Sequence, residues 1–345
     1  MLFPLLGDID TIPNDKYCRQ SDLSIGLIRW KEKMTPTQLR SFATVVRRGS
    51  VRAAAEELGV TEAAVSGSVR SLRNELEDSL FSPSRNGLVF TPGGLRLAQR
   101  AVEMLGLAEQ TRREVHDAHD GRRVLRIAAT SLFAEYCAPG LIELFSKRAD
   151  DLEVELLVEP TTHFPELLMS HGVDVAIGPK ATGTAPYGIV SQEILQYNMV
   201  AVTAPDMSHE EAQELTWFLG PSAVESSGVS QFILERLGVR EAMQRVYTSH
   251  SAAVDEARKG NGVALVPRFS VSEALKAGSL SLVARSDCRA TGTWVATALP
   301  ADKSTQVARE LMRFVATPRS IQAMLSGSGS DIGRFKPSVH ITLWS

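Results

Sequence analysis

Cysteine and long apolar runs are both scarce in this sequence. Three cysteines, Cys18, Cys137 and Cys288, are spread over 345 residues. A set this sparse and odd in number excludes a disulfide framework and is typical of a reducing cytoplasm. No uninterrupted apolar run reaches the roughly 18–20 residues that a membrane-spanning helix needs. We therefore expect a cytoplasmic protein without a membrane partner.

An excess of basic charge is also missing. The 37 lysines and arginines face 40 aspartates and glutamates, so the formal net charge is −3 at pH 7. Because phosphates attract local basic patches, this average does not decide for or against DNA binding. Residues 34–94 contain seven arginines, no lysine and six carboxylates. A single copy of a segment with so small an excess of positive charge is expected to bind DNA poorly. Tight binding would therefore require at least two copies of the chain.

Catalytic and metal-binding motifs are the third absence. His163, His171 and His250 are scattered along the chain, and no cysteine has a neighbouring ligand partner. No G-x-S-x-G nucleophile elbow occurs, and "KGNG" (259–262) precedes an expected strand, whereas a phosphate loop opens a helix. We expect no catalytic residue, no metal and no cofactor, and therefore no enzyme.

The first 33 residues carry little structural information. Their short apolar opening is interrupted by Asp8 and Asp10, which does not fit a signal peptide. Met34 stands directly before a clear helix start. We expect residues 1–33 to be a disordered arm or a mis-called translation start.

A helix begins cleanly after Met34. Thr35 is the expected N-cap, Pro36 suits the first helical position, and Gln38 completes a capping box. Gly49 is expected to end this helix.

Two further helices follow within residues 50–72, "SVRAAAEELGVTEAAVSGSVRSL". Ser50 and Thr61 are expected to cap them, with a short turn at Gly59 between. A helix, a glycine-containing turn and a second helix form a helix-turn-helix, whose second helix can enter a major groove. Taken alone, the stretch also fits a helical hairpin that binds nothing.

A hairpin and a long helix come next. "FSPSRNGLVFTPGG" (81–94) predicts a β-hairpin with "RNG" at its turn, which would be a wing with Arg85 at its tip. Thr91 and Pro92 begin a helix expected to run to about residue 119. It carries two apolar stripes, one for its own domain and one for a partner helix.

From about residue 124 the pattern alternates between strands and helices, which predicts a largely parallel sheet covered by helices. Ligand groups are expected where strands end and helices begin, because free N–H groups and the helix dipole favour anions there. Small hydroxyls and exposed amides suit a carboxylate-bearing metabolite. The effector-binding candidates chosen by this position are Thr130, Ser131, Thr161, Gly178, Thr203, Ser226, Ser249 and Pro267.

Residues 34 to about 324 resemble a LysR-type transcriptional regulator. The resemblance rests on "QLRSFATVVRRGSVRAAAEELGVTEAAVSGSVRSLRNELEDSLF" (38–81), "FTPGG" (90–94), "HGVDVAIGP" (171–179) and "GNGVALVPR" (260–268). There are departures. Thr61, Glu62 and Ala63 stand where the family commonly has Ser-Gln-Pro/Ser, and Gly67 stands where arginine is common.

The resemblance implies an α + α/β fold. A winged helix-turn-helix would occupy residues 34–94, a linker and dimerisation helix 95–120, and an effector-binding domain of periplasmic-binding-protein type 121–324. Its lobe I would comprise about 124–197 and 294–324, and lobe II about 198–293. A flexible tail would follow at 325–345.

The resemblance also implies a DNA-contacting surface on the helix-turn-helix and the wing. The DNA-binding candidates are Arg52, Thr61, Glu62, Ala63, Ser66, Gly67, Ser68, Arg70, Arg73 and Arg85. The partners expected from it are double-stranded DNA, a small-molecule effector between the lobes, and further copies of the chain in a homodimer or homotetramer.

Two functions remain open from the sequence. The first is a ligand-responsive, sequence-specific transcriptional regulator. The alternative is a small-molecule sensor with degenerate DNA-binding capacity, which Glu62, Gly67 and the near-neutral charge of residues 34–94 favour. Salt-dependent DNA binding would separate the two, because a pure sensor would show none.

Overall fold

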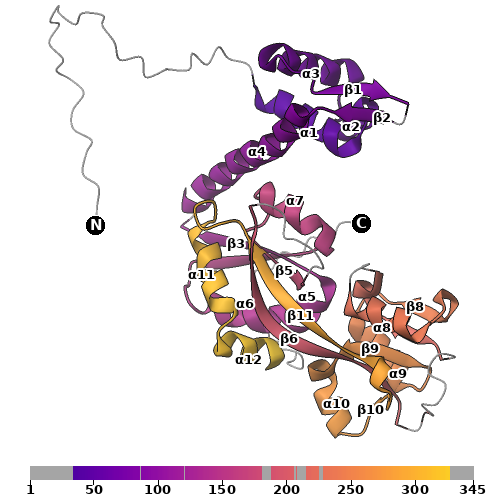
Figure 1. Cartoon of the computed structure of the whole chain (residues 1–345). Helices are drawn as coiled ribbons and strands as arrows, with labels where there is room; N and C mark the ends of the chain where they lie inside the picture. The colour runs from indigo at the N-terminus through magenta and orange to yellow at the C-terminus, as the bar shows by residue number, and fades with distance from the viewer. Residues whose placement is uncertain are drawn as a thin grey trace, which may run out of the picture.

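The computed structural model describes residues 34–85, 87–119, 121–180, 188–205, 207, 215–224 and 228–326. Figure 1 shows a small N-terminal domain at one end, the long helix α4, and a larger C-terminal domain at the other end. The arm predicted for residues 1–33 lies outside the described residues. Within the described ranges, no helix is both long enough and apolar enough to cross a membrane.

The N-terminal domain has three helices and a hairpin in its described part. They are α1 (Pro36–Arg48), α2 (Val51–Leu58), α3 (Glu62–Leu76), β1 (Phe81–Ser84) and β2 (Gly87–Phe90). The predicted caps are confirmed: Thr35 and Gln38 form a capping box, and the Ser50 and Thr61 hydroxyls accept from backbone N–H groups of α2 and α3.

Helix α4 (Pro92–His119) joins the two domains. Its first half packs on α1, burying Ala98 and Ala101 beside Phe42 and Val45 of the N-terminal core. Its last turns reach strand β3 (Figure 1). The helix therefore belongs to the N-terminal core at one end and contacts the C-terminal domain at the other.

The C-terminal domain contains a mixed sheet of order β4-β3-β5-β11-β6-β9-β7-β8, with β10 paired to β6. Its strands are β3 (Arg123–Ala129), β4 (Leu152–Val158), β5 (Val175–Pro179), β6 (Val190–Thr203), β7 (Trp217–Leu219), β8 (Gln244–Val246), β9 (Val263–Pro267), β10 (Ser281–Leu282) and β11 (Arg289–Ala298). Its α-helices are α5 (Ser131–Tyr136), α6 (Ala138–Ser146), α7 (Phe164–Met169), α8 (Val229–Leu237), α9 (His250–Arg258), α10 (Ser272–Lys276), α11 (Gln306–Val315) and α12 (Pro318–Ser326).

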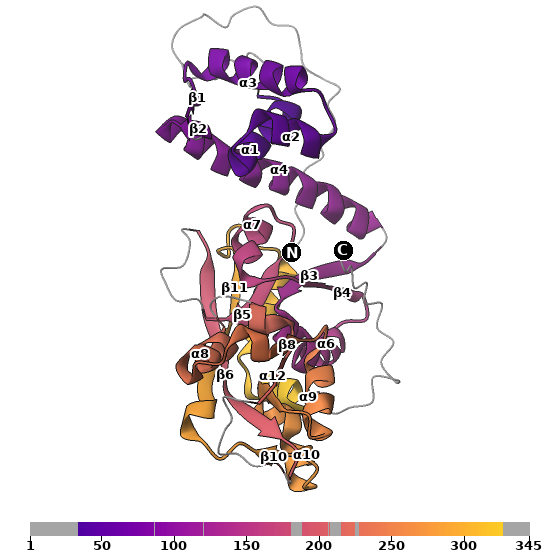
Figure 2. The same ribbon diagram turned by 90° about the vertical axis from the view of Figure 1, so that its right-hand side faces the viewer.

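Two long strands divide this sheet into lobes. β3, β4 and β5 are parallel on one side, and β7, β8 and β9 are parallel on the other. β6 and β11 pair antiparallel between them and run the length of the domain (Figures 1 and 2). The sheet is thus two parallel halves joined by two antiparallel crossing strands, where the sequence predicted a largely parallel sheet.

The end of the described chain differs in detail from expectation. The sequence pattern predicts one helix over about 303–324, and two are present, α11 and α12, separated at Ala316–Thr317. Pro318 explains the break, because proline cannot continue a helix and disfavours the helical conformation of the residue before it. α12 also continues to Ser326, two residues into the predicted tail.

Candidate functional site

Helix α3 presents a polar face to the outside of the N-terminal domain. Val65, Val69 and Leu72 bury its inner face. The opposite side carries Ala63, Gly67 and Arg70, whose spacing of three and four residues places them on one exposed ridge. Figures 1 and 2 both show α3 on the side of its domain that faces away from the C-terminal domain.

The remaining α3 candidates flank this ridge. Thr61, Glu62 and Ser66 are exposed at its start. Ser68 is half-buried, and its hydroxyl donates to the Ala64 carbonyl of its own helix at 3.0 Å. The Thr61 hydroxyl caps the helix through the Ala64 N–H, whereas Glu62 and Ser66 expose their side chains beside the ridge.

Several arginines of this domain are held by carboxylates of the chain. Arg47 and Arg48 both pair with Glu57. Arg52 Nε lies 3.0 Å from Glu56 Oε1, one helical turn away. These pairs hold three positive charges close to negative ones and reduce the attraction that the domain exerts on phosphates.

Arg70 and Arg85 are the candidate arginines that remain exposed without a carboxylate partner among the described residues. Arg70 lies on the α3 ridge. Arg85 lies in the turn after β1, at the tip of the predicted hairpin, which the pairing of β1 with β2 confirms. The two positions offer guanidinium groups to a bound polyanion from the helix and from the wing.

Arg73 is placed differently from the prediction. Its Nη2 donates to the Phe81 carbonyl at 2.7 Å, and its guanidinium lies 4.4 Å from the centre of the Phe81 ring. Arg73 sits about 80° around the helix from the buried stripe, where β1 is its neighbour. Its side chain therefore fixes the wing to α3 and is directed away from the exposed ridge.

Gly67 leaves open space on the ridge. A Cβ built at this position meets no atom within 4 Å among the described residues. Because glycine in a helix interior costs about 0.5–1 kcal/mol relative to alanine, we expect Gly67→Ala to raise the free energy of unfolding of the N-terminal domain by about that amount. Urea unfolding followed by circular dichroism measures it. A destabilised variant would contradict the open environment of Gly67.

A small cavity lies between the lobes of the C-terminal domain. Its volume is about 20 Å³, enough for about one water molecule. Its walls come from both lobes and from both crossing strands. The lining residues are Thr130, Leu132, Pro179, Tyr197, Met199, Ser222, Gly228, Val229, Ser230 and Trp294.

Polar groups without partners surround this cavity. Thr130 and Trp294 are 1% and 0% exposed, and neither Thr130 Oγ1 nor Trp294 Nε1 has a hydrogen-bond partner among the described residues. The buried Ser131 Oγ likewise has no hydrogen-bond partner among the described residues. Buried polar groups are normally paired, because an unpaired one costs about 1–3 kcal/mol. An indole N–H can only donate, so this site calls for a ligand with an acceptor atom.

The predicted effector residues divide into those near the cavity and those away from it. Thr130 lines it, and Thr161 and Gly178 lie beside Thr130: a Cβ on Gly178 would come within about 3 Å of both threonine methyl groups. Ser249 caps α9 through the Ala252 N–H. Ser226 lies outside the described residues.

Thr203 and Pro267 are not among the lining residues. Thr203 Oγ1 donates to the Gly262 carbonyl at 2.8 Å, within lobe II. Pro267 is buried in β9 opposite Met199. The sequence analysis placed ligand groups where strands end and helices begin. This expectation fails for Thr203, because β6 is a crossing strand whose end lies in lobe II. It is the middle of β6, at Tyr197 and Met199, that reaches the cavity.

Sequence reasoning therefore missed the side chains from the crossing strands and from lobe II. Tyr197 stacks on Trp294 with ring centres 4.1 Å apart, and Phe133 contacts the Trp294 ring edge-on. Ser222 lies on the 3₁₀ helix η2 (Pro221–Val224) and Ser230 on α8. Among these residues, Trp294 in "GTWVATALP" is the one that the sequence could have marked as a site residue, because a buried indole N–H usually needs a hydrogen-bond partner.

A chain of hydrogen bonds connects the two lobes beside the cavity. Glu135 of α5 accepts from the backbone N–H groups of His250 and Ser251, each at 2.8 Å. Its Oε2 also lies 2.8 Å from His250 Nδ1, and its Oε1 accepts from the Ser251 hydroxyl at 2.6 Å. His250 Nε2 lies 2.8 Å from Ser222 Oγ.

These contacts fix the charge of Glu135. Although burial raises its pKa, the hydrogen bonds from His250 and Ser251 outweigh it and lower the pKa to about 2. His250 is 1% exposed and packs on Gly220, where a Cβ would lie 2.1 Å from His250 Cδ2. A carboxylate of lobe I thus occupies the N-terminus of a lobe II helix, next to a buried histidine.

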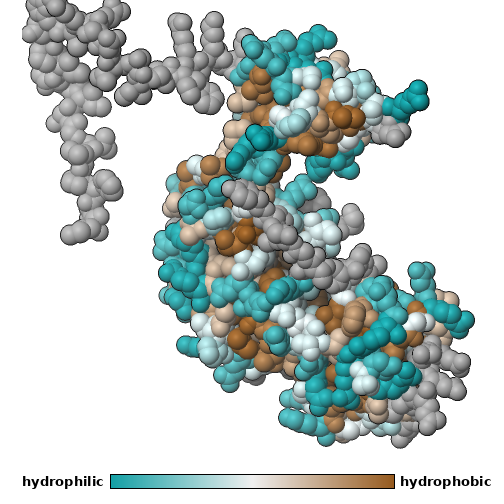
Figure 3. Space-filling model, in the orientation of Figure 1, coloured by the Kyte–Doolittle hydropathy of each residue, from teal (hydrophilic) through white to brown (hydrophobic). Residues whose placement is uncertain are grey.

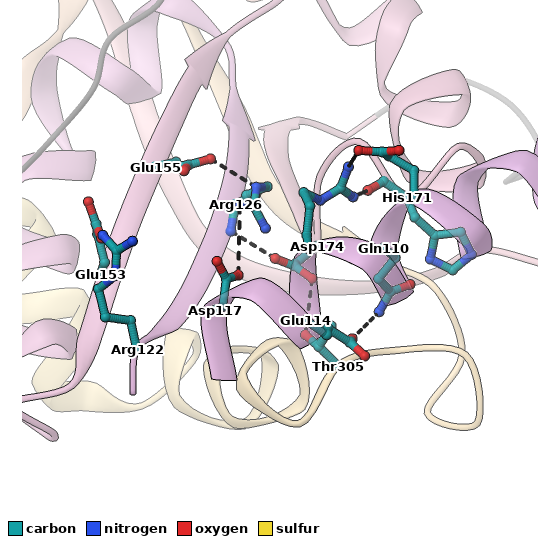
Figure 4. Close-up of polar contacts among 12 residues, drawn as sticks. Gln110, Glu114, Asp117, Arg122, Arg126, Glu153, Glu155, His171, Asp174 and Thr305 are labelled. Atoms are coloured by element: carbon teal, nitrogen blue, oxygen red, sulfur yellow. Dashed lines mark hydrogen bonds and ion pairs between the residues drawn. The ribbon is translucent and has the colours of Figure 1, made fainter. Parts of the chain in front are cut away.

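Helix α4 is fixed to lobe I by a second set of polar contacts, shown in Figure 4. Arg113 of α4 donates to the His171 carbonyl. Arg126 of β3 lies between two carboxylates, with its Nε 2.9 Å from Glu155 Oε2 and its Nη2 4.0 Å from Asp117 Oδ2 on α4. These ion pairs link the last turns of the helix to the edge of the sheet.

Asp174 lies in the same junction (Figure 4). It accepts from the Arg126 N–H at 2.8 Å and from the Thr305 hydroxyl at 3.0 Å, while burial raises its pKa. Gly106 of α4 approaches lobe I even more closely, since a Cβ there would lie 2.2 Å from the Ser170 carbonyl oxygen. Helix α4 and lobe I are therefore in direct contact through backbone as well as side-chain atoms.

Two family models match the chain. The model described as "Bacterial regulatory helix-turn-helix protein, lysR family" matches residues 36–95, from α1 through the wing to the start of α4. The model described as "LysR substrate binding domain" matches residues 118–318, more than half of the chain.

Individual proteins agree with these matches. The chain is 48% identical over 327 residues to the uncharacterized HTH-type transcriptional regulator Rv0377 of Mycobacterium tuberculosis (strain ATCC 25618 / H37Rv), covering 90% of this chain and 100% of that protein. It is 30% identical over 250 residues to the RuBisCO operon transcriptional regulator of Allochromatium vinosum, covering 71% and 78%.

A solved structure shares the fold. The crystal structure of ArgP from Mycobacterium tuberculosis matches with a TM-score of 0.53 at 19% identity, covering 86% of this chain and 98% of that one. With the helix-turn-helix, the linker helix and the two-lobed domain in place, the chain belongs to the LysR family of transcriptional regulators, with an N-terminal DNA-binding domain and a C-terminal effector-binding domain.

Proposed function

We propose that α3 is inserted into a major groove, with Arg70, Ser66 and Glu62 facing base edges or phosphates and Arg85 contacting the backbone from the wing. The observation that carries this proposal is the exposed α3 ridge, whose arginine is left without a carboxylate partner while Arg47, Arg48 and Arg52 are paired. Arg73 is assigned to holding the wing.

The proposal requires more than one copy of the chain. Met104, Leu107 and Val115 of α4 are 42%, 55% and 67% exposed and lie on one side of the helix. Figure 3 shows apolar surface exposed on the N-terminal domain as well. A partner's α4 is the occupant that fits, because an apolar helical stripe packs best against another helix. Two copies would also double the number of exposed arginines facing DNA.

Leu107→Lys tests this assembly. Placing a charge in the centre of the stripe removes apolar burial worth about 1.5–3 kcal/mol per side and introduces repulsion between like charges. We expect the variant to shift toward monomer in analytical ultracentrifugation and to lose DNA affinity with it. Lys substitution of Glu109, exposed on the opposite face of the same helix, is the matched control. An unchanged oligomeric state in Leu107→Lys would contradict the assignment of α4.

The effector site is proposed to be the interlobe cavity. The unpartnered Thr130 hydroxyl and Trp294 N–H, together with the N-terminus of α8, suit an anionic acceptor such as a carboxylate. The cavity holds about one water, so a metabolite enters only when the lobes separate. The contacts of Gly106, Arg113 and Arg126 would carry that movement to α4 and hence to the spacing of the DNA-binding domains.

We propose that the effector is bound and released unchanged, in the cytoplasm, without catalysis or cofactor.

The regulator as a whole is tested by a gel-shift titration of the purified chain against its upstream intergenic DNA at two salt concentrations. Binding that weakens with salt is expected, since arginines that contact phosphates release counterions. Failure to bind upstream or other genomic fragments at low salt would overturn the DNA-reading proposal.

The second candidate is the sensor with degenerate DNA-binding capacity. The pairing of Arg47 and Arg48 with Glu57 and of Arg52 with Glu56 favours it, because these three arginines are less available to phosphates. It predicts ligand binding by the C-terminal domain with no salt-dependent DNA binding. The same gel shift separates it from the regulator.

A further inference from the structure

The two lobes of the C-terminal domain are connected by a pair of strands that can bend. Within the described ranges the chain passes between the lobes in β6 and again in β11. The pairing of these strands is irregular at the crossing, where the register shifts between Trp294 and Val295. Such an irregularity bends an antiparallel pair locally. The contacts across the cleft therefore decide whether the lobes lie open or closed.

Helix α9 of lobe II is completed by a residue of lobe I. Its N-cap Ser249 accepts from the Ala252 N–H at 3.2 Å, which is ordinary capping within lobe II. The N–H groups of His250 and Ser251 instead donate to Glu135 of α5, one to each carboxylate oxygen and both at 2.8 Å. The first turn of α9 thus obtains two of its hydrogen-bond acceptors from the other lobe.

Two side chains strengthen this contact. The Ser251 hydroxyl donates to Glu135 Oε1 at 2.6 Å, and His250 Nδ1 lies 2.8 Å from Oε2. Because two of the donors are backbone N–H groups, the contact exists in either protonation state of the imidazole. The pKa of Glu135 is lowered to about 2, so the acceptor is charged near neutral pH. Hydrogen bonds to a charged acceptor are the stronger ones, and the dipole of α9 favours an anion at this end.

The cleft beside Glu135 is closed. The cavity between the lobes has a volume of about 20 Å³, which leaves room for about one water molecule. Tyr136, the neighbour of Glu135 on α5, packs edge-on against Phe269 of lobe II with ring centres 6.4 Å apart. His250 is 1% exposed. Contacts of the chain itself therefore hold the lobes together.

We propose that Glu135 is a lock that keeps the two lobes closed in the ligand-free protein, by placing the chain's own carboxylate at the N-terminus of α9. Where lobes close only around a ligand, the ligand supplies the contacts that favour the closed state. Here Glu135 supplies them. A molecule that enters the cleft has to separate Glu135 from α9 first, so the lock opposes entry. This inference concerns the ligand-free chain and depends neither on the class of effector nor on DNA binding.

The distance between the lobes tests the lock. Asp150 of lobe I and Ser279 of lobe II are exposed, so Asp150→Cys and Ser279→Cys each accept a spin label. Cys18 is replaced by serine, while Cys137 and Cys288 are buried. Pulsed electron paramagnetic resonance then measures the distance between the two labels, and an excess of unlabelled chain restricts the measurement to one copy. The otherwise wild-type chain is expected to give one distance with no ligand added.

Two variants break the lock from opposite sides. In Glu135→Ala the ratio of closed to open molecules is expected to fall at least about a hundredfold, because four contacts of one carboxylate are lost together, and a second distance appears. Ser251→Glu is expected to do the same by charge repulsion, and α9 stays folded because an acidic residue suits its first turn. Glu256→Gln is the matched control, since its partners Lys259 and Asn261 belong to lobe II as well.

Three results would overturn the proposal. The first is two distances in the otherwise wild-type, ligand-free chain, which would show lobes that are not locked. The second is one unchanged distance in both Glu135→Ala and Ser251→Glu. The third is a second distance of equal weight in Glu256→Gln, which would deny Glu135 a specific role. The distances are measured without DNA, so this result and that of the gel shift are independent.

Discussion

Replacing Arg70 with alanine is expected to weaken DNA binding by at least about 30-fold. An arginine that contacts a guanine edge or a phosphate in the groove is worth about 1–3 kcal/mol, and a dimer loses it twice. Arg70 stands exposed on the α3 ridge without a partner among the described residues, so its removal leaves the fold intact. Fluorescence anisotropy with labelled operator DNA measures the change.

The salt dependence of the same titration shows which kind of contact is lost. A phosphate contact lowers the slope of log affinity against log salt by about one per arginine, whereas a base contact leaves the slope nearly unchanged and relaxes sequence preference. Arg258→Ala, which removes an exposed arginine paired with Asp255 in lobe II, is the matched control. If Arg70→Ala bound DNA with wild-type affinity, this would contradict the proposal that α3 is inserted into the major groove.

Replacing Glu135 with glutamine is expected to destabilise the effector domain by about 2 kcal/mol near neutral pH. The pKa of Glu135 is lowered from 4.5 to about 2, so its ionised form stabilises the fold. That contribution is complete above the unfolded pKa of about 4.5 and is lost as the pH falls toward 2. The magnitude allows for solvent screening of a side chain that is 23% exposed.

Urea unfolding followed by tryptophan fluorescence tests this, because Trp217 and Trp294 are both buried in the effector domain. The stability difference between wild type and Glu135→Gln is expected to be largest above pH 5 and to shrink as the pH falls below 4.5. Glu143→Gln, which removes an exposed partner of Lys147, is the control. A difference that stays constant down to pH 3 would show that the ionised carboxylate is not the source.

The DNA-binding half was predictable because its signals are local. Thr35, Ser50 and Thr61 cap helices through hydrogen bonds three residues away, and the hairpin follows from one turn sequence. Arg73 marks the limit of such reasoning. Whether a side chain faces DNA or the wing depends on where Phe81 lies in space, which helix periodicity does not contain.

The lining of the cavity between the lobes was only partly predictable. Thr130 was expected near a ligand because it follows a parallel strand, where the convergence of strand ends applies, and it lines the cavity. Trp294 and Tyr197 lie in the middle of β11 and β6, and they reach the cavity because these strands cross between the lobes. Glu135 and His250 are 115 residues apart, so no sequence pattern joins them. Contacts between the lobes depend on how the whole domain packs in three dimensions. The periodicity of a single sequence does not contain this information.

The most direct test of the central claim is a dimethyl sulfate footprint of the wild-type protein on its operator, because this reagent methylates guanine N7 in the major groove. If α3 of each copy enters a major groove, N7 protection is expected in two blocks separated by whole helical turns, and Arg70→Ala is expected to lose it. Binding that leaves every guanine N7 of the operator reactive would contradict the assignment of α3 as the DNA-reading helix.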